Sequence, residues 1–180
     1  MKSVNLLEKI RNVPDWPKKG IQFKDITTLI QDPKGLKEAI DIMVEPYRRM
    51  NIQKVVSMEA RGFIFGSMVA YLLGAGFVPI RKKGKLPYTT VEFKYEKEYG
   101  PDIITMHVDA INSGERVLIL DDLLATGGTA LAAAELVKQL KGVIVEFCFL
   151  IELTHSLHGR KVLEDAGYKV RSFIEIPVEE

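Results

Sequence analysis

VLILDDLLATGGT, running from Val117 to Thr129, is the most informative stretch of this sequence. Its first four residues form a continuous apolar run, which is typical of a parallel strand buried on both faces. Two adjacent carboxylates follow, and Gly127 and Gly128 then precede a segment with helical spacing of alanines and leucines. We interpret the stretch as a buried strand, a short loop and the start of a helix.

Strand-like and helix-like segments alternate on both sides of this stretch. Apolar runs predict five strands, at residues 54–58, 77–80, 117–120, 143–151 and 168–173. Helical spacing predicts helices at residues 63–73, from about 129 to 140, and around 162–163. Such alternation is typical of an α/β fold with a mainly parallel central sheet flanked by helices. Ligands bind beyond the carboxyl ends of the strands in such sheets, so the residues after each strand are the candidates for a site.

Two regions do not follow this alternation. Residues 1–50 are interpreted as a helical cap, with a short helix near the start and a second helix that begins at Asp32. Residues 81–108 contain two β-rich runs, 90–95 and 103–108, which predict the arms of a β-ribbon. A long insertion of this kind is often functional, for example as a lid.

Composition limits the classes of function. The 180 residues are 47% hydrophobic with a formal net charge of +1, which fits a single domain over residues 1–180. A dedicated nucleic-acid-binding protein has a strongly basic face, so we expect no nucleic-acid partner. Residues 1–11 hold no continuous apolar segment, and no apolar run reaches the roughly 18 residues of a membrane helix. We therefore expect a cytoplasmic protein without membrane association, and the lone Cys148 is expected to be buried.

The loop after the 117–120 run combines acidic and phosphate-binding features. Free N–H groups at a helix start favour an anion, and glycines let the backbone come close to a phosphate. A ribose 5-phosphate carries both a phosphate and hydroxyls that can meet Asp121 and Asp122. The phosphate is then expected at the loop residues Ala125, Thr126, Gly127, Gly128 and Thr129. The two aspartates can also lie near Mg²⁺ held by a pyrophosphate, although no direct protein ligand of the metal is assigned.

Two further segments carry positive charge toward the same end of the sheet. Arg61 follows the first strand of the alternation, beside Glu59 and Ala60, and precedes a helix whose N–H groups again favour an anion. Arg81, Lys82 and Lys85 begin the ribbon segment and can neutralise a leaving pyrophosphate. A solvated surface is the usual interpretation of such a charged run, and the residues alone leave both readings open.

These motifs resemble, in order, those of the type I phosphoribosyltransferases. The stretch from Asp121 to Thr129 resembles the family's motif for 5-phosphoribosyl pyrophosphate (PRPP), in the form found in its adenine-specific members. Further matches cover nearly the whole chain, at residues 14–17, 20, 23–26, 59–63, 81–87, 98–100 and 152–153. The resemblance implies the type I phosphoribosyltransferase fold, with residues 1–50 as the cap and base-pocket segment and 81–108 as a mobile hood.

The resemblance also implies an activity and a set of roles. The implied reaction transfers the 5-phosphoribosyl group of PRPP to N9 of adenine with Mg²⁺, giving AMP and pyrophosphate, in a homodimer. Glu98 is the implied proton-transfer residue. Pyrophosphate is assigned to Glu59, Ala60, Arg61, Arg81, Lys82, Lys85 and Tyr99, and adenine to Gln22, Phe23 and Lys24.

Two alternative functions remain open, and departures from the family pattern bear on the first. Lys24 stands where the family usually has Arg, and Gln22 replaces an apolar residue, so hypoxanthine, guanine or xanthine are alternative bases. A PRPP-sensing regulator without catalysis is the second alternative. Such regulators often carry a DNA-binding module, and we find no spare segment for one in these residues. The presence of Glu98 and of the basic ribbon segment favours an enzyme.

Overall fold

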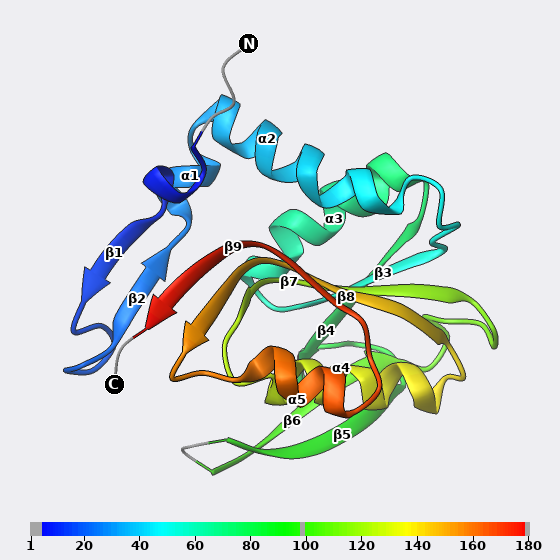
Figure 1. Cartoon of the computed structure of the whole chain (residues 1–180). Helices are drawn as coiled ribbons and strands as arrows, with labels where there is room; N and C mark the ends of the chain where they lie inside the picture. The colour runs from blue at the N-terminus through cyan, green and yellow to red at the C-terminus, as the bar shows by residue number, and fades with distance from the viewer. Residues whose placement is uncertain (1–4, 98–99, 179–180) are drawn as a thin grey trace.

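Within residues 5–97 and 100–178, which the computed structural model describes, a seven-stranded sheet forms the centre of the molecule (Figure 1). Its strand order is β5-β6-β4-β3-β7-β8-β9. The strands are β3 (Lys54–Met58), β4 (Gly76–Lys82), β5 (Thr90–Lys97), β6 (Gly100–His107), β7 (Arg116–Leu124), β8 (Val143–His155) and β9 (Val170–Val178). Neighbouring strands from β4 through β3, β7 and β8 to β9 are parallel, whereas β6 is antiparallel to β4 and β5. The predicted α/β fold with a mainly parallel sheet is confirmed.

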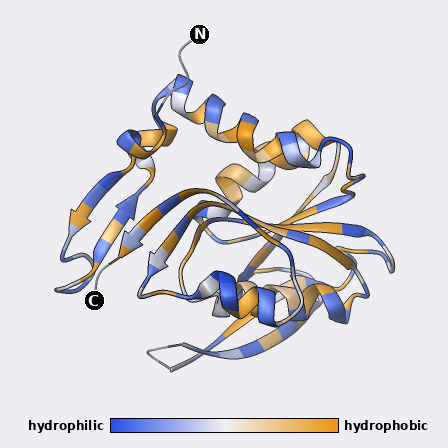
Figure 2. Cartoon of the chain, viewed as in Figure 1, coloured by the Kyte–Doolittle hydropathy of each residue, from blue (hydrophilic) through white to orange (hydrophobic). Residues whose placement is uncertain are grey.

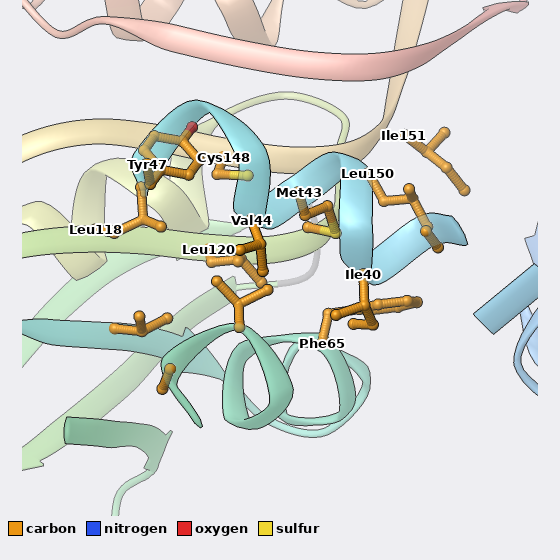
Figure 3. Close-up of a cluster of buried hydrophobic side chains, with 14 of the residues drawn as sticks. Ile40, Met43, Val44, Tyr47, Phe65, Leu118, Leu120, Cys148, Leu150 and Ile151 are labelled. Carbon is orange, nitrogen blue, oxygen red and sulfur yellow. The ribbon is translucent and has the colours of Figure 1, made fainter. Parts of the chain in front are cut away.

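Helices cover both faces of this sheet (Figure 1). On one face lie α2 (Pro33–Val44) and α3 (Arg61–Leu73), and on the other lie α4 (Gly128–Gln139) and α5 (Gly159–Asp165). Hydrophobic residues run along the central strands that these helices cover (Figure 2). Between α2, α3 and the sheet, Ile40, Met43 and Phe65 pack against Leu120 and Leu150 (Figure 3). The alanine-rich inner face of α4 packs on the opposite face of the same strands.

Local sequence signals explain where the helices begin and end. Asp32 caps α2, since its carboxylate accepts a hydrogen bond from the N–H of Gly35 at 3.1 Å. Pro33 occupies the first turn, where its missing N–H costs nothing. The helix α3 ends at Gly74, whose φ of 65° is the left-handed conformation that glycine adopts readily. The predicted start of α2 and the predicted end of α3 are therefore confirmed.

The N-terminal region is only partly the helical cap that we predicted. Near its start the structure has a single 3-10 turn, η1 (Leu7–Lys9), and two antiparallel strands follow, β1 (Arg11–Pro14) and β2 (Gln22–Asp25). An ion pair of 2.6 Å joins Arg11 to Asp25 across this ribbon. Cross-strand pairing therefore overrides the helical spacing. The remaining short elements are α1 (Thr27–Ile30) and η2 (Glu45–Tyr47).

The predicted ribbon is confirmed as β5 and β6, and it is an extension of the central sheet. Arg81 and Lys82 of β4 pair with Thr105 and Ile104 of β6. Every second residue of β5 packs toward α4, so that Val91, Phe93 and Tyr95 join the core on that face. Because of this packing, the base of the hood is anchored to the body of the domain.

The expectation for the lone cysteine is met by the structure. Cys148 is fully buried and forms no disulfide, as expected for a lone thiol in an apolar strand. None of the helices within the described residues has the length and apolar character that crossing a bilayer requires.

The close packing of α3 on β3 depends on Gly66. A Cβ at this position would overlap the hydroxyl oxygen of Ser57 and lie 2.9 Å from the Cβ of Ser57. We expect Gly66→Ala to lower the free energy of unfolding by about 2 kcal/mol. Overpacking the core destabilises the fold by more free energy than the higher helix propensity of alanine contributes. Urea denaturation measures this loss.

Replacing the opposing side chain is the control for this contact. Gly66→Ala combined with Ser57→Gly removes the overlapping atoms, and we expect the double variant to recover part of the loss. A Gly66→Ala variant with an unchanged urea midpoint would contradict the close approach.

Candidate functional site

A cleft of about 280 Å³ opens at the carboxyl ends of β3 and β7. The chain continues from β3 to β4 on one side and from β7 to β8 on the other, so these two strands flank the point at which the strand order reverses. Ligands of open α/β sheets bind at such a point. The lining residues come from two strand-to-helix loops and their surroundings: Met58, Glu59, Ala60, Arg61, Asp121, Asp122, Leu123, Leu124, Ala125, Thr126, Gly127, Thr129, Ala130 and Phe149.

The loop after β7 presents backbone donors to the cleft. Gly127 precedes α4 with a φ of 84°, and no side chain caps the helix. The first N–H groups of a helix have no acceptor within it, so those of α4 are available to an anion. Thr126 is exposed beside them, while the hydroxyl of Thr129 lies 3.2 Å from the hydroxyl of Tyr95 on β5. The predicted phosphate loop therefore lines the cleft, except for Gly128, and also contacts the hood.

The two aspartates belong to β7, which corrects our placement of them beyond the strand. Pairing with β8 continues to Leu124, past the end of the apolar run. One carboxylate oxygen of Asp121 accepts a hydrogen bond from the N–H of Asp122 at 2.9 Å. It lies so close to the start of α3 that a Cβ on Gly62 would be 2.5 Å away. Asp122 is 3% exposed, and its Oδ2 lies 2.9 Å from Nε of Arg61.

Burial governs the ionisation of these aspartates. It raises the pKa of Asp121 well above its ordinary value, and the neighbouring charge of Asp122 raises it further. Burial also raises the pKa of Asp122, although the guanidinium of Arg61 opposes the change. The cleft floor is therefore a pair of carboxyl groups that resist holding two negative charges. A ligand that donates hydrogen bonds to them stabilises their charged form.

Arg61 links the cleft floor to the N-terminal ribbon. Its Nη1 donates to the backbone carbonyl of Lys24 at 3.3 Å, and its guanidinium carbon lies 5.1 Å from the ring centroid of Phe23. Trp16 packs edge-on against the same ring, with centroids 4.3 Å apart. The structure thus brings Phe23 close to the acidic floor through one arginine.

The side chains of Gln22 and Lys24 do not share the face of Phe23. Asn12, on the paired strand β1, donates to the amide oxygen of Gln22 and accepts from Nζ of Lys24, each at 2.7 Å. Alternate residues of a strand point to opposite faces, so these two side chains lie on the far face of the ribbon. The prediction that both residues contact a base therefore rests on their backbone groups, because their side chains lie away from Phe23.

The basic segment converges on Glu59. Its carboxylate lies 3.3 Å from Nη2 of Arg81 and 3.2 Å from Nζ of Lys85, and it accepts from the N–H of Lys82 at 2.7 Å. Burial acts to raise the pKa of Glu59, but these donors outweigh it and hold the pKa below its ordinary value. The Glu59–Ala60 peptide bond is cis. The charged groups of Arg81 and Lys85 therefore share one carboxylate, while the ammonium of Lys82 lies 3.5 Å from the carboxylate of Asp102.

Two predicted residues, Glu98 and Tyr99, lie outside the described residues. Within the described part, no group of three His, Cys, Asp or Glu side chains is placed to hold a metal ion. Trp16 and Tyr95 contact predicted site residues, and neither was predicted to belong to the site. The alternation of Val91, Phe93 and Tyr95 was the available signal for an inward-facing tyrosine.

Comparisons with known proteins agree on one family. The family profile described as phosphoribosyl transferase domain matches residues 25–180. A protein of Agrobacterium fabrum named adenine phosphoribosyltransferase is 55% identical over 166 residues, covering 92% of each chain. The crystal structure of adenine phosphoribosyltransferase from Rhodothermus marinus has 53% identity and a TM-score of 0.90, covering 95% of this chain and 96% of that one.

A more distant solved structure carries ligands. The adenine phosphoribosyltransferase of Saccharomyces cerevisiae, complexed with an imino-altritol bisphosphate and adenine, has 38% identity and a TM-score of 0.85. The similarity covers 93% of this chain and 95% of the yeast chain. The same fold therefore extends to a structure whose ligands are a base and a sugar-like bisphosphate.

The raised pKa of Asp121 predicts a variant that is more stable than the natural protein. A carboxyl group whose pKa is raised in the folded state stabilises that state at pH values below its unfolded pKa of about 3.9. This stabilisation is lost as the pH rises through the folded-state pKa. We expect Asp121→Asn to raise the melting temperature at pH 8, with a smaller gain at pH 4. Calorimetry across this pH range measures the difference.

Asp25 provides a control of opposite sign. The N–H of Thr27 and the guanidinium of Arg11 lower the pKa of Asp25 to about 2. Its contribution to stability is present above about pH 3.9 and is lost as the pH falls through 2. Asp25→Asn is therefore expected to lower the melting temperature at pH 8. Two variants with the same sign at pH 8 would contradict the assigned shifts.

Proposed function

This chain belongs to the phosphoribosyl transferase family, and we propose from that premise that it makes AMP from adenine and PRPP and releases pyrophosphate. The reaction forms a bond between N9 of adenine and C1 of the ribose as the bond from C1 to pyrophosphate breaks. The carrying observation is the cleft at the strand-order reversal, where backbone N–H groups and two buried carboxyl groups meet.

We assign the ribose phosphate to the loop between β7 and α4. The free N–H groups at the start of α4, with Thr126 beside them, suit the 5′-phosphate. Asp121 and Asp122 accept hydrogen bonds from the 2′ and 3′ hydroxyls of the ribose. Each such bond favours the charged carboxylate, which offsets the cost of burying two acidic groups side by side. The binding energy of the sugar is thereby used to organise the cleft floor.

Pyrophosphate is assigned to the loop between β3 and α3 and to the basic segment. The loop contributes Ala60 and Arg61, and Arg81, Lys82 and Lys85 supply charge at its edge. Glu59 holds the charged groups of Arg81 and Lys85 together, and Asp102 holds the ammonium of Lys82 beside them, so that all three can face the leaving group. Two buried carboxyl groups, one already paired with Arg61, suit a Mg²⁺ ion that arrives with PRPP. That ion supplies charge neutralisation for the departing pyrophosphate.

Adenine is assigned to the side of Phe23 that faces Arg61. The ring of Phe23 offers a flat surface for stacking, and the backbone of residues 22–24 offers the acceptors that an exocyclic amino group needs. N9 attacks C1 from the face opposite the leaving group, as C1 gains oxocarbenium character. Glu98 transfers a proton to or from the purine. The protein mainly positions the reactants and stabilises separating charge.

A dimer and a cytoplasmic location belong to the same proposal. The outward face of α3 exposes Tyr71 (83%) and Leu72 (44%), which suits contact with a second copy. This helix begins at Arg61, so a dimer contact along the helix would affect the position of Arg61 in the site. A buried, free Cys148 fits a reducing compartment.

We expect the purified protein with PRPP and Mg²⁺ to form AMP from adenine. The kcat/KM for hypoxanthine, guanine or xanthine should be lower by at least about 100-fold, because unpaired buried groups penalise the wrong base. Arg61→Ala should lower kcat/KM for adenine by about 100-fold through loss of a charge beside the leaving group. The exposed Arg49, in the turn after η2, provides the control variant Arg49→Ala. Chromatography of the nucleotides measures product.

Two outcomes would contradict this function. AMP formation that is no faster than IMP or GMP formation would keep the PRPP site and overturn the adenine assignment. PRPP binding without product from any base would favour the regulator.

Glu98→Gln is expected to lower kcat more than it raises the KM of PRPP.

The dimer has its own test. We expect sedimentation equilibrium to give twice the chain mass of 20.3 kDa. Tyr71→Glu with Leu72→Glu should give the monomer, since buried charges oppose association. Val162→Glu, on the exposed side of α5, is the control and should leave the mass unchanged. A wild-type monomer at micromolar concentration would exclude the proposed dimer.

A further inference from the structure

The phosphate loop is packed against the start of α5. A Cβ on Gly159 would overlap the carbonyl oxygen of Ala125 and lie 3.0 Å from its carbonyl carbon. A Cβ on Gly127 would in turn lie 3.0 Å from the carbonyl oxygen of Gly159. The two backbones are therefore in direct contact, and any shift of Gly159 displaces the loop.

The residue after Gly159 is fixed by a network of hydrogen bonds. Nε of Arg160 donates to the carboxylate of Glu152 at 3.0 Å, and Nη2 donates to it at 2.5 Å. Nη1 of Arg160 donates to the carbonyl of Val170 at 3.0 Å, and Nη2 also donates to the hydroxyl of Ser172 at 2.8 Å. That hydroxyl donates to Glu152 at 2.5 Å. One guanidinium thus joins α5 to β8 and β9.

The network lies where the loop leaves the sheet. Glu152 is 5% exposed and pairs in register with Leu124, the last residue of β7 before the loop. A buried carboxylate needs its partners, so the guanidinium has one favourable position. None of the three side chains in the network lines the cleft. Their effect on a ligand therefore acts through the backbone of Gly159.

We propose that Glu152, Arg160 and Ser172 are positioning residues that hold the phosphate loop in its binding conformation by fixing Gly159 against Ala125 and Gly127. This inference rests on the proposed function, because it assigns the loop to the phosphate of PRPP. Anion binding by backbone N–H groups requires them to converge on one point, and a displacement of about 1 Å can cost up to about 100-fold in rate. The network fixes that convergence before the ligand arrives.

The test compares this network with a second buried ion pair on the same strands. Glu146 of β8 pairs with Arg171 of β9 at 3.2 Å, and the side chains are 8% and 40% exposed. Glu152 and Arg160 have similar exposures of 7% and 33%. Glu146 pairs in register with Leu118, in the interior of β7 and away from the loop. Arg160→Lys and Arg171→Lys are therefore matched variants that keep charge and lose the planar fork.

We expect Arg160→Lys to raise the Kd of PRPP with Mg²⁺ about tenfold, measured by isothermal titration calorimetry, with the KM of adenine changed less than about twofold. Gly159→Ala should have a similar effect. Arg171→Lys should leave the Kd of PRPP within about twofold, while both arginine variants lower the melting temperature by similar amounts. Ser172→Ala, which removes one hydroxyl, is the milder variant if Arg160→Lys fails to fold, and should raise the Kd about threefold.

Equal changes in the Kd of PRPP for the Arg160 and Arg171 variants would overturn the positioning role. So would a lowered melting temperature for Arg160→Lys with an unchanged Kd. A wild-type protein that binds no PRPP would instead overturn the proposed function, and the positioning role with it. Normal AMP formation by the wild type separates these two failures.

Discussion

The ion pair between Arg61 and Asp122 is the interaction on which the rest of the site depends. Burying an acidic group is costly, and β7 buries two in succession at the end of the sheet. Arg61 offsets part of that cost from the start of α3, only 2.9 Å away. The same guanidinium reaches the carbonyl of Lys24 and the ring of Phe23, so the N-terminal ribbon is joined to the acidic floor. One side chain therefore sets the spacing between the N-terminal ribbon and the acidic floor of the cleft.

The sequence was sufficient to predict the central fold, because each parallel strand is a continuous apolar run and each helix has a clear spacing. It failed where pairing between distant segments overrides local pattern. The strand β1 forms by antiparallel pairing with β2, and no local period in the sequence reveals this pairing. The strand β7 continues through Asp121 because β8 supplies partners as far as Glu152, although the apolar run ends at Leu120.

The sequence was sufficient to predict which residue types form the candidate site. It was less informative about which face of a strand each side chain occupies. The glycine-rich loop and the acidic pair carry their chemistry in a short sequence, and both line the cleft. Which side of β2 faces the cleft depends on its register with β1, and the side chain of Asn12 holds Gln22 and Lys24 on the far side. The role of Gly62 is likewise invisible in sequence, since it provides the space that the carboxylate of Asp121 occupies. Close backbone approaches of this kind depend on tertiary packing.

The phosphate loop is held from two directions. On one side the hydroxyl of Tyr95 contacts Thr129, and on the other Gly159 packs against the carbonyl of Ala125. The loop therefore has little freedom except toward the cleft, where the N–H groups at the start of α4 have no side-chain cap. Ordering a loop on binding costs about 1–2 kcal/mol per residue in backbone entropy, so a loop already ordered by its neighbours retains more of its binding energy for the ligand. Because Tyr95 belongs to β5, the packing that orders the loop is continuous with the ribbon of β5 and β6.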